Sequence, residues 1–592
     1  MFLRSHRRDK DGKEHHYWSL VETVRTPDGP RQRRLCYLGE LNDSAQARWL
    51  KTIEVFNEQG ESTQLKLFPS AVEPPVDNSG VVRVLLEKVR LERTRQLGPC
   101  FLGWELWRRL KLDEFFQSAL DADGADVAWS RVAAILAINR LCAPGSELAI
   151  EQRWYPATAL GDVLNIEAGK INHTRLYRCL DRILPQKTKL EQHLKQRYGE
   201  LFSAEFDVML YDLTSTYVEG DAGANPMLRR GYSRDHRPDC LQLVLALIVN
   251  PEGFPCSYEV FNGNRADVTT MEVMLRLVER KYGKARRIWV MDRGIVSEAN
   301  LAAIRKRDGQ YLVGTPRSQM KEFETQLKES TNWEQVRDEV QVKLISIPGG
   351  QETFILCKTE GRQKKEQAIR NRFAARIETM LDSLKKQVKA GRLKNRDKIH
   401  VRIGRILAAH PNVADLYAVA VKEESGQLSV EWSAKPGQQQ WREAREGAYL
   451  LRTNLTAATA SELWEKYMQL TEVEAAFRAL KSELSIRPLF HQLERRVKAH
   501  VMIAFLGYAL WVTLKHLLQG KQSEWSASRA LAELATLQSA DIVLPTTEGH
   551  EIRLRRITEP TAEQQKLLNQ LAIELPSYLQ INQQCSADFR VA

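Results

Sequence analysis

Two short apolar runs, each ending near an aspartate, decide how this sequence is interpreted. The first is Phe206-Asp-Val-Met-Leu-Tyr-Asp212, and the second is Arg287-Ile-Trp-Val-Met-Asp-Arg-Gly294. Runs of this length that are rich in apolar and aromatic residues favour buried strands. We therefore expect strands at about 206–212 and 286–292, with Asp212 and Asp292 at their ends. A strand-end aspartate alone is common in α/β proteins, so the interpretation depends on what surrounds the pair.

The elements around the two runs predict an α/β fold. Further strands are expected at about 240–249, 254–261 and 310–314, and helices at about 267–282 and 297–307. Ser297 is a plausible N-cap of the second helix, with Glu298 in its first turn. Three strands joined by short connections, followed by alternating helices and strands, match a ribonuclease H-like core. In that fold an aspartate lies on the first strand and another follows the fourth, which are the positions of Asp212 and Asp292.

A third acid, Glu474, lies in a stretch that we predict to be one helix from Tyr467 to Lys481. Tyr467, Glu474 and Lys481 are seven residues apart, so they would share one helical face. Glu472 is the competing acid, but it lies about 160° from Glu474 around the helix. Two carboxylates on strands and one on a helix are typical of sites that hold two Mg²⁺ ions and displace phosphodiesters in line. An ordinary amphipathic helix is the simpler explanation if the two aspartates are ignored.

The chain divides into six predicted regions. Its length of 592 residues is too great for one core. We expect a basic β-rich module with a linker at 1–75, a helical DNA-binding region at 81–204, and the first part of the core at 205–316. A β-rich, basic insertion at 317–445, the second part of the core at 446–520 and a tail at 521–592 without assigned function follow.

Charge and its distribution point to a polyanionic partner. The net charge is +12 and the pI is about 9.2, which favours nucleic acid without indicating a fold. Arg175 and Arg178 are predicted on a helix capped by Asn172, at a spacing that suits contact with a phosphate backbone. For the basic helix within the insertion, phosphate binding and a merely solvated polar face are about equally plausible. In both places, solvated charges on a packing helix are the alternative.

Other features indicate a cytoplasmic protein without a membrane segment. The eight cysteines are scattered and form no Cys-x-x-Cys pair, which argues against a zinc ribbon or a disulfide framework. The N-terminus lacks the apolar stretch of a signal peptide. The longest apolar run, Val501 to Leu514, is too short to span a bilayer and is predicted to be a buried helix.

The sequence resembles the DDE transposases of bacterial insertion sequences, in the insertion-sequence-four superfamily. The signature of that group is Tyr, two residues, Arg, three residues, Glu, six residues, Lys. The chain has Tyr467, Glu474 and Lys481, with Leu470 where Arg is expected, and Arg478 is a candidate replacement for that charge. The resemblance also includes the stretches that begin Tyr211-Asp-Leu-Thr, Gly231-Tyr-Ser-Arg-Asp, Phe261-Asn-Gly-Asn, Met291-Asp-Arg-Gly and Arg487-Pro-Leu-Phe-His.

The resemblance implies a function and its residues. Asp212, Asp292 and Glu474 would be the catalytic ligands of two Mg²⁺ ions, with Mn²⁺ as a possible substitute. Contacts to DNA are expected from Tyr467, Arg478, Lys481, Arg293, Arg175 and Arg178. The partners would be double-stranded DNA, as terminal inverted repeats and target DNA, and a second copy of the chain in a synaptic homodimer. The expected location is the bacterial cytoplasm, at the nucleoid.

Two alternatives stay open from sequence. The first is a ribonuclease H-like nuclease that hydrolyses nucleic acid without strand transfer. The second is a non-catalytic DNA-binding protein derived from a transposase, which loss of any one carboxylate would favour. All three acids are present in this chain.

Overall fold

The computed structural model describes residues 2–10, 13–26, 29–40, 52–56, 62–66, 83–576 and 579, with gaps at 221, 285, 348–349, 425–426 and 548. The chain forms two compact units, which we describe separately. The first unit comprises Met1–Ser203, Thr216–Gln242 and Phe477–Ala592, and the second comprises Ala204–Ser215 and Leu243–Ala476. The predicted linker with Pro69, Pro74 and Pro75 lies outside the described residues.

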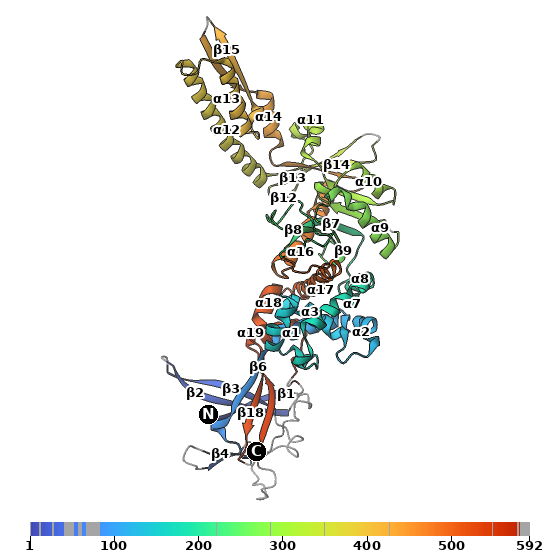
Figure 1. Ribbon diagram of the computed structural model, residues 1–592, viewed down its shortest axis with the longest axis vertical. Coiled ribbons are helices and arrows are strands. Elements are labelled where there is room, and N and C mark those ends of the chain that lie inside the picture. Colours follow the sequence, from blue (N-terminus) through green and yellow to red (C-terminus); the bar gives the residue numbers. More distant parts are fainter. Residues whose placement is uncertain are drawn as a thin grey trace. The chain divides into compact units, whose positions relative to one another are not determined.

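A nine-stranded mixed sheet organises the second unit (Figure 1). Its order is β12-β13-β14-β17-β11-β10-β7-β8-β9. β10 runs parallel to both β7 and β11, whereas β8 and β9 are antiparallel to each other. The five predicted core strands are β7 (Val208–Val218), β8 (Leu241–Val249), β9 (Pro255–Asn262), β10 (Ile288–Met291) and β11 (Gln310–Gly314). Their apolar runs are almost fully buried, as expected for strands covered on both faces.

The two helices of the core form where the sequence predicts them. They are α9 (Met271–Tyr282) and α10 (Glu298–Arg305). The Ser297 side chain accepts a hydrogen bond from the Asn300 amide, so its predicted role as an N-cap is confirmed. The predicted end of the first strand is wrong, because β7 continues beyond Asp212 to Val218.

The insertion between β11 and β17 (Ala448–Thr453) has two parts. The short helix α11 (Glu324–Lys328) and the strands β12 (Glu334–Arg337), β13 (Val340–Ser346) and β14 (Thr353–Thr359) come first, and the strands extend the central sheet. The second part is mostly helical, with α12 (Glu360–Lys389), α13 (Arg396–Ala409), the hairpin β15 (Tyr417–Glu424) and β16 (Gln427–Ala434), and α14 (Pro436–Arg445). The strands and a basic helix in the insertion agree with the prediction, but α13 and α14 make the insertion more helical than the β-rich region expected.

Helices dominate the first unit. The longer ones are α1 (Gly98–Arg109), α2 (Leu112–Leu120), α3 (Trp129–Cys142), α7 (His173–Ile183), α8 (Lys187–Phe202), α17 (Glu494–Gln519), α18 (Ala527–Leu534) and α19 (Ala562–Gln570). Shorter helices are α4 (Glu147–Ala149), α5 (Tyr155–Ala157) and α6 (Leu160–Val163). Its strands are β1 (Phe2–Lys10), β2 (Lys13–Thr26), β3 (Gly29–Glu40), β4 (Thr52–Phe56), β5 (Ser62–Lys66), β6 (Arg90–Gln96), β18 (Gln538–Pro545) and β19 (Glu551–Ile557).

The tail contains the helices α18 and α19 and the strands β18 and β19, which the sequence did not indicate. β18 pairs with β19 and also, antiparallel, with β6 from the other end of the chain. Arg555 on β19 is 2% exposed and donates to Asp541 on β18 at 2.7 Å, so a buried ion pair joins the two strands. The tail is therefore part of the first unit's packing.

α17 is long and apolar enough to cross a membrane, but 78% of its most apolar window is buried inside the protein. It packs against α3 and α7. The prediction of a buried helix is confirmed, and its extent is greater than the run from Val501 to Leu514 suggested.

Candidate active site

Two of the three predicted acids lie side by side on neighbouring strands. β7 and β10 are parallel, and Tyr211 is in register with Met291. The next residues are Asp212, within β7, and Asp292, directly after the end of β10. Neighbouring strands are about 4.8 Å apart, which brings the two backbones within reach of one shared ligand. Asp212 is half-buried and Asp292 is exposed. The structure thus brings these two carboxylates together at one place on the sheet.

Tyr467 is positioned against Asp292. It lies in α15 (Ala460–Met468), and its hydroxyl lies close to the Asp292 carboxylate. Burial, and then the negative charge of Asp292, raise the pKa of the Tyr467 hydroxyl, so this group stays a neutral donor. Sequence reasoning assigned Tyr467 to DNA, but the structure shows that it also contacts an acid of the site.

Gly314, a residue that the sequence did not single out, makes this contact possible. It ends β11, the strand beside β10. A Cβ atom at Gly314 would lie 2.8 Å from the Tyr467 hydroxyl oxygen and 3.5 Å from Asp292 Oδ1. Contacts below 3.0 Å force neighbours to move, so only glycine leaves room for the tyrosine here. The one hint of this role in the sequence is that Gly314 ends the predicted strand that follows the strand of Asp292.

The predicted single helix from Tyr467 to Lys481 is interrupted. α15 ends at Met468, Gln469 is its C-cap, and α16 (Leu470–Ser482) begins directly afterwards. Tyr467 and Glu474 are therefore on different helices, because the backbone switches at Gln469 to a tighter turn in which the Glu472 amide donates to its carbonyl. The heptad from Glu474 to Lys481 lies within α16.

Glu474 is exposed on α16, whereas Glu472 is half-buried. Within the described part of the chain, no three His, Cys, Asp or Glu side chains approach closely enough to hold one metal ion. The structure therefore brings Asp212 and Asp292 together but does not add Glu474 to the same ligand group. Leu470, at the signature position of arginine, is 7% exposed.

Lys481 is held by a carboxylate that sequence reasoning missed. Its ammonium donates to Asp235 Oδ1 at 2.8 Å, and Arg487 forms an ion pair with the same oxygen. The Asp235 side chain is 4% exposed and that of Lys481 is 14% exposed. Burial lowers the pKa of Lys481, and hydrogen bonding to Asp235 opposes this effect. Asp235 lies in the stretch Gly231-Tyr-Ser-Arg-Asp that carried part of the resemblance, which was the only available signal.

Comparison with known families settles the class of the protein. A model described as "Transposase DDE domain" matches residues 204–510, just over half of the chain. The chain belongs to the DDE transposases. A second model, described as the N-terminal domain of IS1634 family transposases, matches residues 3–60. The two matches together identify an insertion-sequence transposase, and with it an enzyme.

Solved transposase structures resemble this one weakly. A piggyBac transposase synaptic complex with hairpin DNA aligns over 74% of this chain and 79% of its own, at 9% identity and a TM-score of 0.35. A Mos1 transposase paired-end complex with the left transposon end aligns over 32% and 60%, at 12% identity and a TM-score of 0.14. Scores this low support no residue-level argument. No curated protein matches the chain.

The remaining predicted DNA contacts of this transposase differ in their surroundings. On α7, Asn172 caps the helix as predicted, and Arg178 is exposed. Arg175 is instead half-buried and donates to Asp126 at 2.7 Å. Arg293, directly after Asp292, and Arg478, on α16, are both exposed.

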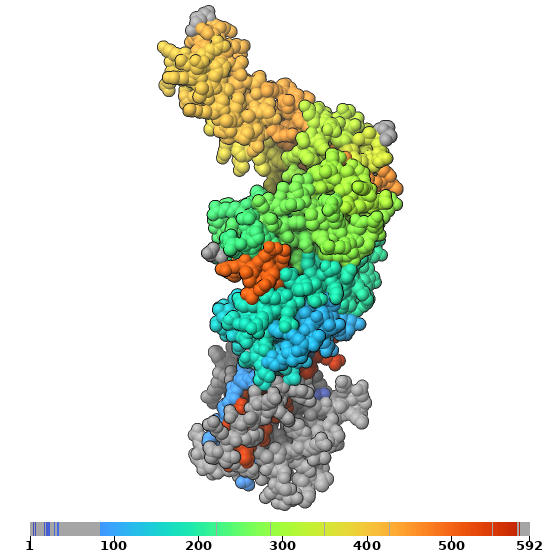
Figure 2. Space-filling model, turned by 45° about the vertical axis from the view of Figure 1, so that its right-hand side comes forward, coloured from blue at the N-terminus to red at the C-terminus, as the bar shows by residue number. Residues whose placement is uncertain are grey.

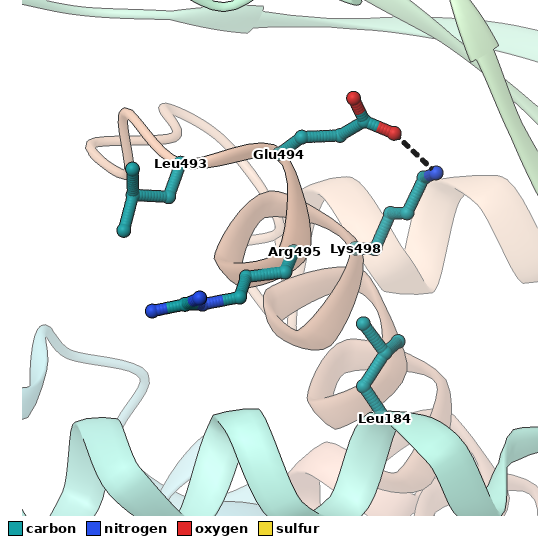
Figure 3. A pocket seen from close by; sticks show the side chains of 5 residues that line it. All are labelled: Leu184, Leu493, Glu494, Arg495 and Lys498. Atoms are coloured by element: carbon teal, nitrogen blue, oxygen red, sulfur yellow. Dashed lines mark hydrogen bonds and ion pairs between the residues drawn. The ribbon is translucent and has the colours of Figure 1, made fainter.

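A hollow of about 390 Å³ lies at the start of α17 in the first unit (Figure 3). Leu184, Leu493, Glu494, Arg495 and Lys498 line it. Lys498 is paired with Glu494 on the same helix, and Arg495 donates to Asp181 at 2.9 Å. Because both cations are compensated, we assign the hollow no part in the reaction.

Proposed function

We propose that this transposase binds the terminal inverted repeats of a bacterial insertion sequence, cleaves the DNA at the ends of the element and joins the freed 3′-hydroxyls to target DNA. The observation that carries the proposal is the parallel register that aligns Asp212 with Asp292. Transposases of this class act on DNA ends held in pairs, so a homodimer is part of the proposal. The chain would work in the cytoplasm, at the nucleoid, and would belong to the insertion-sequence-four superfamily.

The acids of the site fit a hard divalent cation. Mg²⁺ prefers carboxylate oxygens and keeps several of its waters, and the paired aspartates offer such oxygens beside solvent. Asp212, Asp292 and Glu474 would hold two Mg²⁺ ions, or Mn²⁺ in their place, with the exposed Glu474 side chain brought to the aspartates by a shift of α16. The ions would supply Lewis acidity for phosphodiester displacement.

The protein's own groups have distinct proposed roles. Tyr467 fixes the orientation of Asp292 through its hydroxyl. Lys481, held by Asp235, would contact a phosphate near the DNA end. Arg478 and Arg293 are exposed and would bind the flanking backbone, as phosphate contacts fix register without reading sequence. Arg178 would contact the repeat farther from the cut, whereas Arg175, paired with Asp126, would only help to hold α7 in place.

The test is cleavage of a labelled duplex that carries the element's own terminal repeat, with Mg²⁺, Mn²⁺ or EDTA. Asp292→Asn and Glu474→Gln should each lower the cleavage rate by at least about 100-fold, since each removes charge from the reacting centre. Glu472→Gln is the matched control on the same helix and should cleave normally. If Glu472→Gln abolishes cleavage and Glu474→Gln does not, the assignment of the third acid is wrong.

The same assay separates the alternatives. Joined products with target DNA support the transposition reaction. Metal-dependent nicking without joining, when a pre-cleaved end is supplied, would favour a nuclease. Binding without cleavage in either metal would favour a DNA-binding protein that has lost its activity.

A further inference from the structure

The distal part of the insertion is a small folded arm with a core of its own. We define the arm as α12, α13, β15 and β16; these elements lie together at one end of the second unit (Figure 1). Ile377 and Leu381 of α12 pack with Leu416 and Tyr417, and Val388 packs with Ile403 of α13. α12 has 30 residues, and a helix of that length extends about 45 Å. Its start adjoins β14, so the far end of the arm is well separated from the sheet.

The far end of the arm is densely positive. Eight lysines and arginines and one acid, Asp397, occur from Lys386 to Arg405, and all eight are exposed. We call these residues the basic tip: Lys386, Lys389, Arg392, Lys394, Arg396, Lys398, Arg402 and Arg405. None of them forms an ion pair within the described part of the chain. Figure 2 shows the surface of the arm in yellow, open to solvent on the face in view.

Several exposed cations elsewhere in the arm are compensated, although Lys365, Arg372, Arg376 and Lys385 of α12 are exposed as well. Near the start of α12, Arg362 pairs with Glu366 at 3.1 Å and Lys364 pairs with Glu360 at 3.5 Å. On β15, Lys422 pairs with Glu431 at 2.5 Å. What distinguishes the tip is the density of its unpaired cations, eight against one acid in 20 residues. Like charges at helical spacing repel each other and weaken a helix. An anionic ligand bound at the tip would remove this repulsion.

The positions of the charges on α13 show how a ligand would approach. Ile399 and Ile403 are buried in the arm's core, whereas Lys398, Arg402 and Arg405 are exposed. These three lie within about 60° of one another around the helix, on a face turned by about 110° from the two isoleucines. A ligand can therefore reach these three side chains from outside without displacing any packing.

The chemistry of the tip favours a nucleic-acid backbone over a lipid surface. A helix that lies on a membrane presents large apolar side chains beside its cations. In the tip, the apolar face of α13 is buried, and Val401, 55% exposed, is the one large exposed hydrophobic residue from Lys386 to Arg405. Lysine and arginine without such an apolar face suit phosphates along a duplex.

We propose that the basic tip is a DNA-binding surface that holds a duplex through its phosphates, independently of sequence. This inference rests on the proposed function, since it assumes that DNA is the substrate. It adds a contact site far along the insertion from the paired aspartates. Contacts of this kind fix the position of a duplex and do not read its bases.

The experiment measures binding of a random-sequence duplex by the full chain at several salt concentrations, in an Asp292→Asn background that prevents cutting. The tip variant carries Lys398→Gln, Arg402→Gln and Arg405→Gln. Its slope of log affinity against log salt should be less steep by about 2.7, because each lost phosphate contact accounts for about 0.9. The control variant carries Arg362→Gln, Lys364→Gln and Lys422→Gln, which remove the same charge from paired positions.

A smaller slope in the tip variant alone supports the proposal. Equal changes in both variants would show that net charge alone matters, and no change in either would exclude tip contact; each overturns the proposal. Reduced binding of the tip variant to anionic phospholipid vesicles, with unchanged DNA binding, would also overturn it. Thermal melts of both variants establish that the fold is intact. Since no step requires cleavage, failure here is distinct from failure of the proposed reaction.

Discussion

Cations at the end of α16 and cations of the basic tip carry the same charge but differ in their surroundings. Lys481 and Arg487 share one buried carboxylate, Asp235. The tip has eight exposed cations and one acid in 20 residues. Where the fold supplies the counter-charge, it fixes the side chain in place. Where it does not, the side chain stays available, and the counter-charge must come from a ligand.

The largest effect is expected from removing the shared carboxylate. Asp235→Asn leaves two cations without their partner, and breaking a buried pair from one side costs about 3 kcal/mol of folding free energy. We expect a clear fall in the urea midpoint. The control is Asp239→Asn in the same loop, whose side chain is 63% exposed and pairs with Arg237, and which should hardly change the midpoint. Equal shifts in the two variants would mean that Asp235 is not a structural anchor.

The second prediction concerns Asp292, whose neighbour is the neutral Tyr467 hydroxyl and not a cation. In Gly314→Ala the new methyl group displaces the Tyr467 hydroxyl from Asp292. Since small misplacements at a reacting centre cost up to about 100-fold in rate, we expect cleavage to slow by about 10-fold to 100-fold. Gly437→Ala, where nothing lies within 4 Å of the new atom, is the control.

The outcome can be sharpened with a double variant. Tyr467→Phe removes the hydroxyl that collides with the methyl group. If the Gly314→Ala variant is slow because its methyl group displaces the tyrosine, adding Tyr467→Phe should relieve the collision and raise the melting temperature of the variant. It should not restore the cleavage rate, because the hydroxyl beside Asp292 is still missing. Normal cleavage by Gly314→Ala alone would contradict the proposed role of this contact.

The smallest effect is expected on α7, where both kinds of cation occur on one helix. Arg178→Gln should lower affinity for the terminal repeat a few-fold and reduce the salt slope by about 0.9, with no change in stability. Arg175→Gln removes a cation already paired with Asp126. It should lower the unfolding free energy by less than about 1 kcal/mol and leave the salt slope unchanged. The opposite pattern, in paired titrations and melts, would reverse the assignment.

Sequence was most informative where structure is local. Apolar runs predicted the five core strands, and Ser297 was identified as a cap because capping depends on the next three residues. The paired aspartates followed from the expected order of those strands. The interruption at Gln469 was missed, because the residues on both sides favour a helix and only the backbone shows the switch between α15 and α16.

Contacts between distant parts of the chain could not be predicted in this way. Asp235 and Lys481 are 246 residues apart, and nothing near either residue indicates the other. The pairing of β18 with β6 could not be predicted for the same reason, since one strand lies in the N-terminal part of the chain and the other in the C-terminal part. Gly314 was missed because its role depends on a tyrosine that follows it by 153 positions in the sequence.

The arm leaves and re-enters the core at a single point. β14 ends at Thr359, whose amide donates to the Gly447 carbonyl at 3.0 Å, just before β17 begins. The arm is joined to the sheet by these two adjacent antiparallel strands, and α14, which follows the arm, packs Trp441 and Ala444 against the core. Closing a longer or shorter loop changes the free energy only slowly with length. The arm can therefore be exchanged between related transposases, or replaced by a short turn, while the register that aligns the two aspartates stays the same.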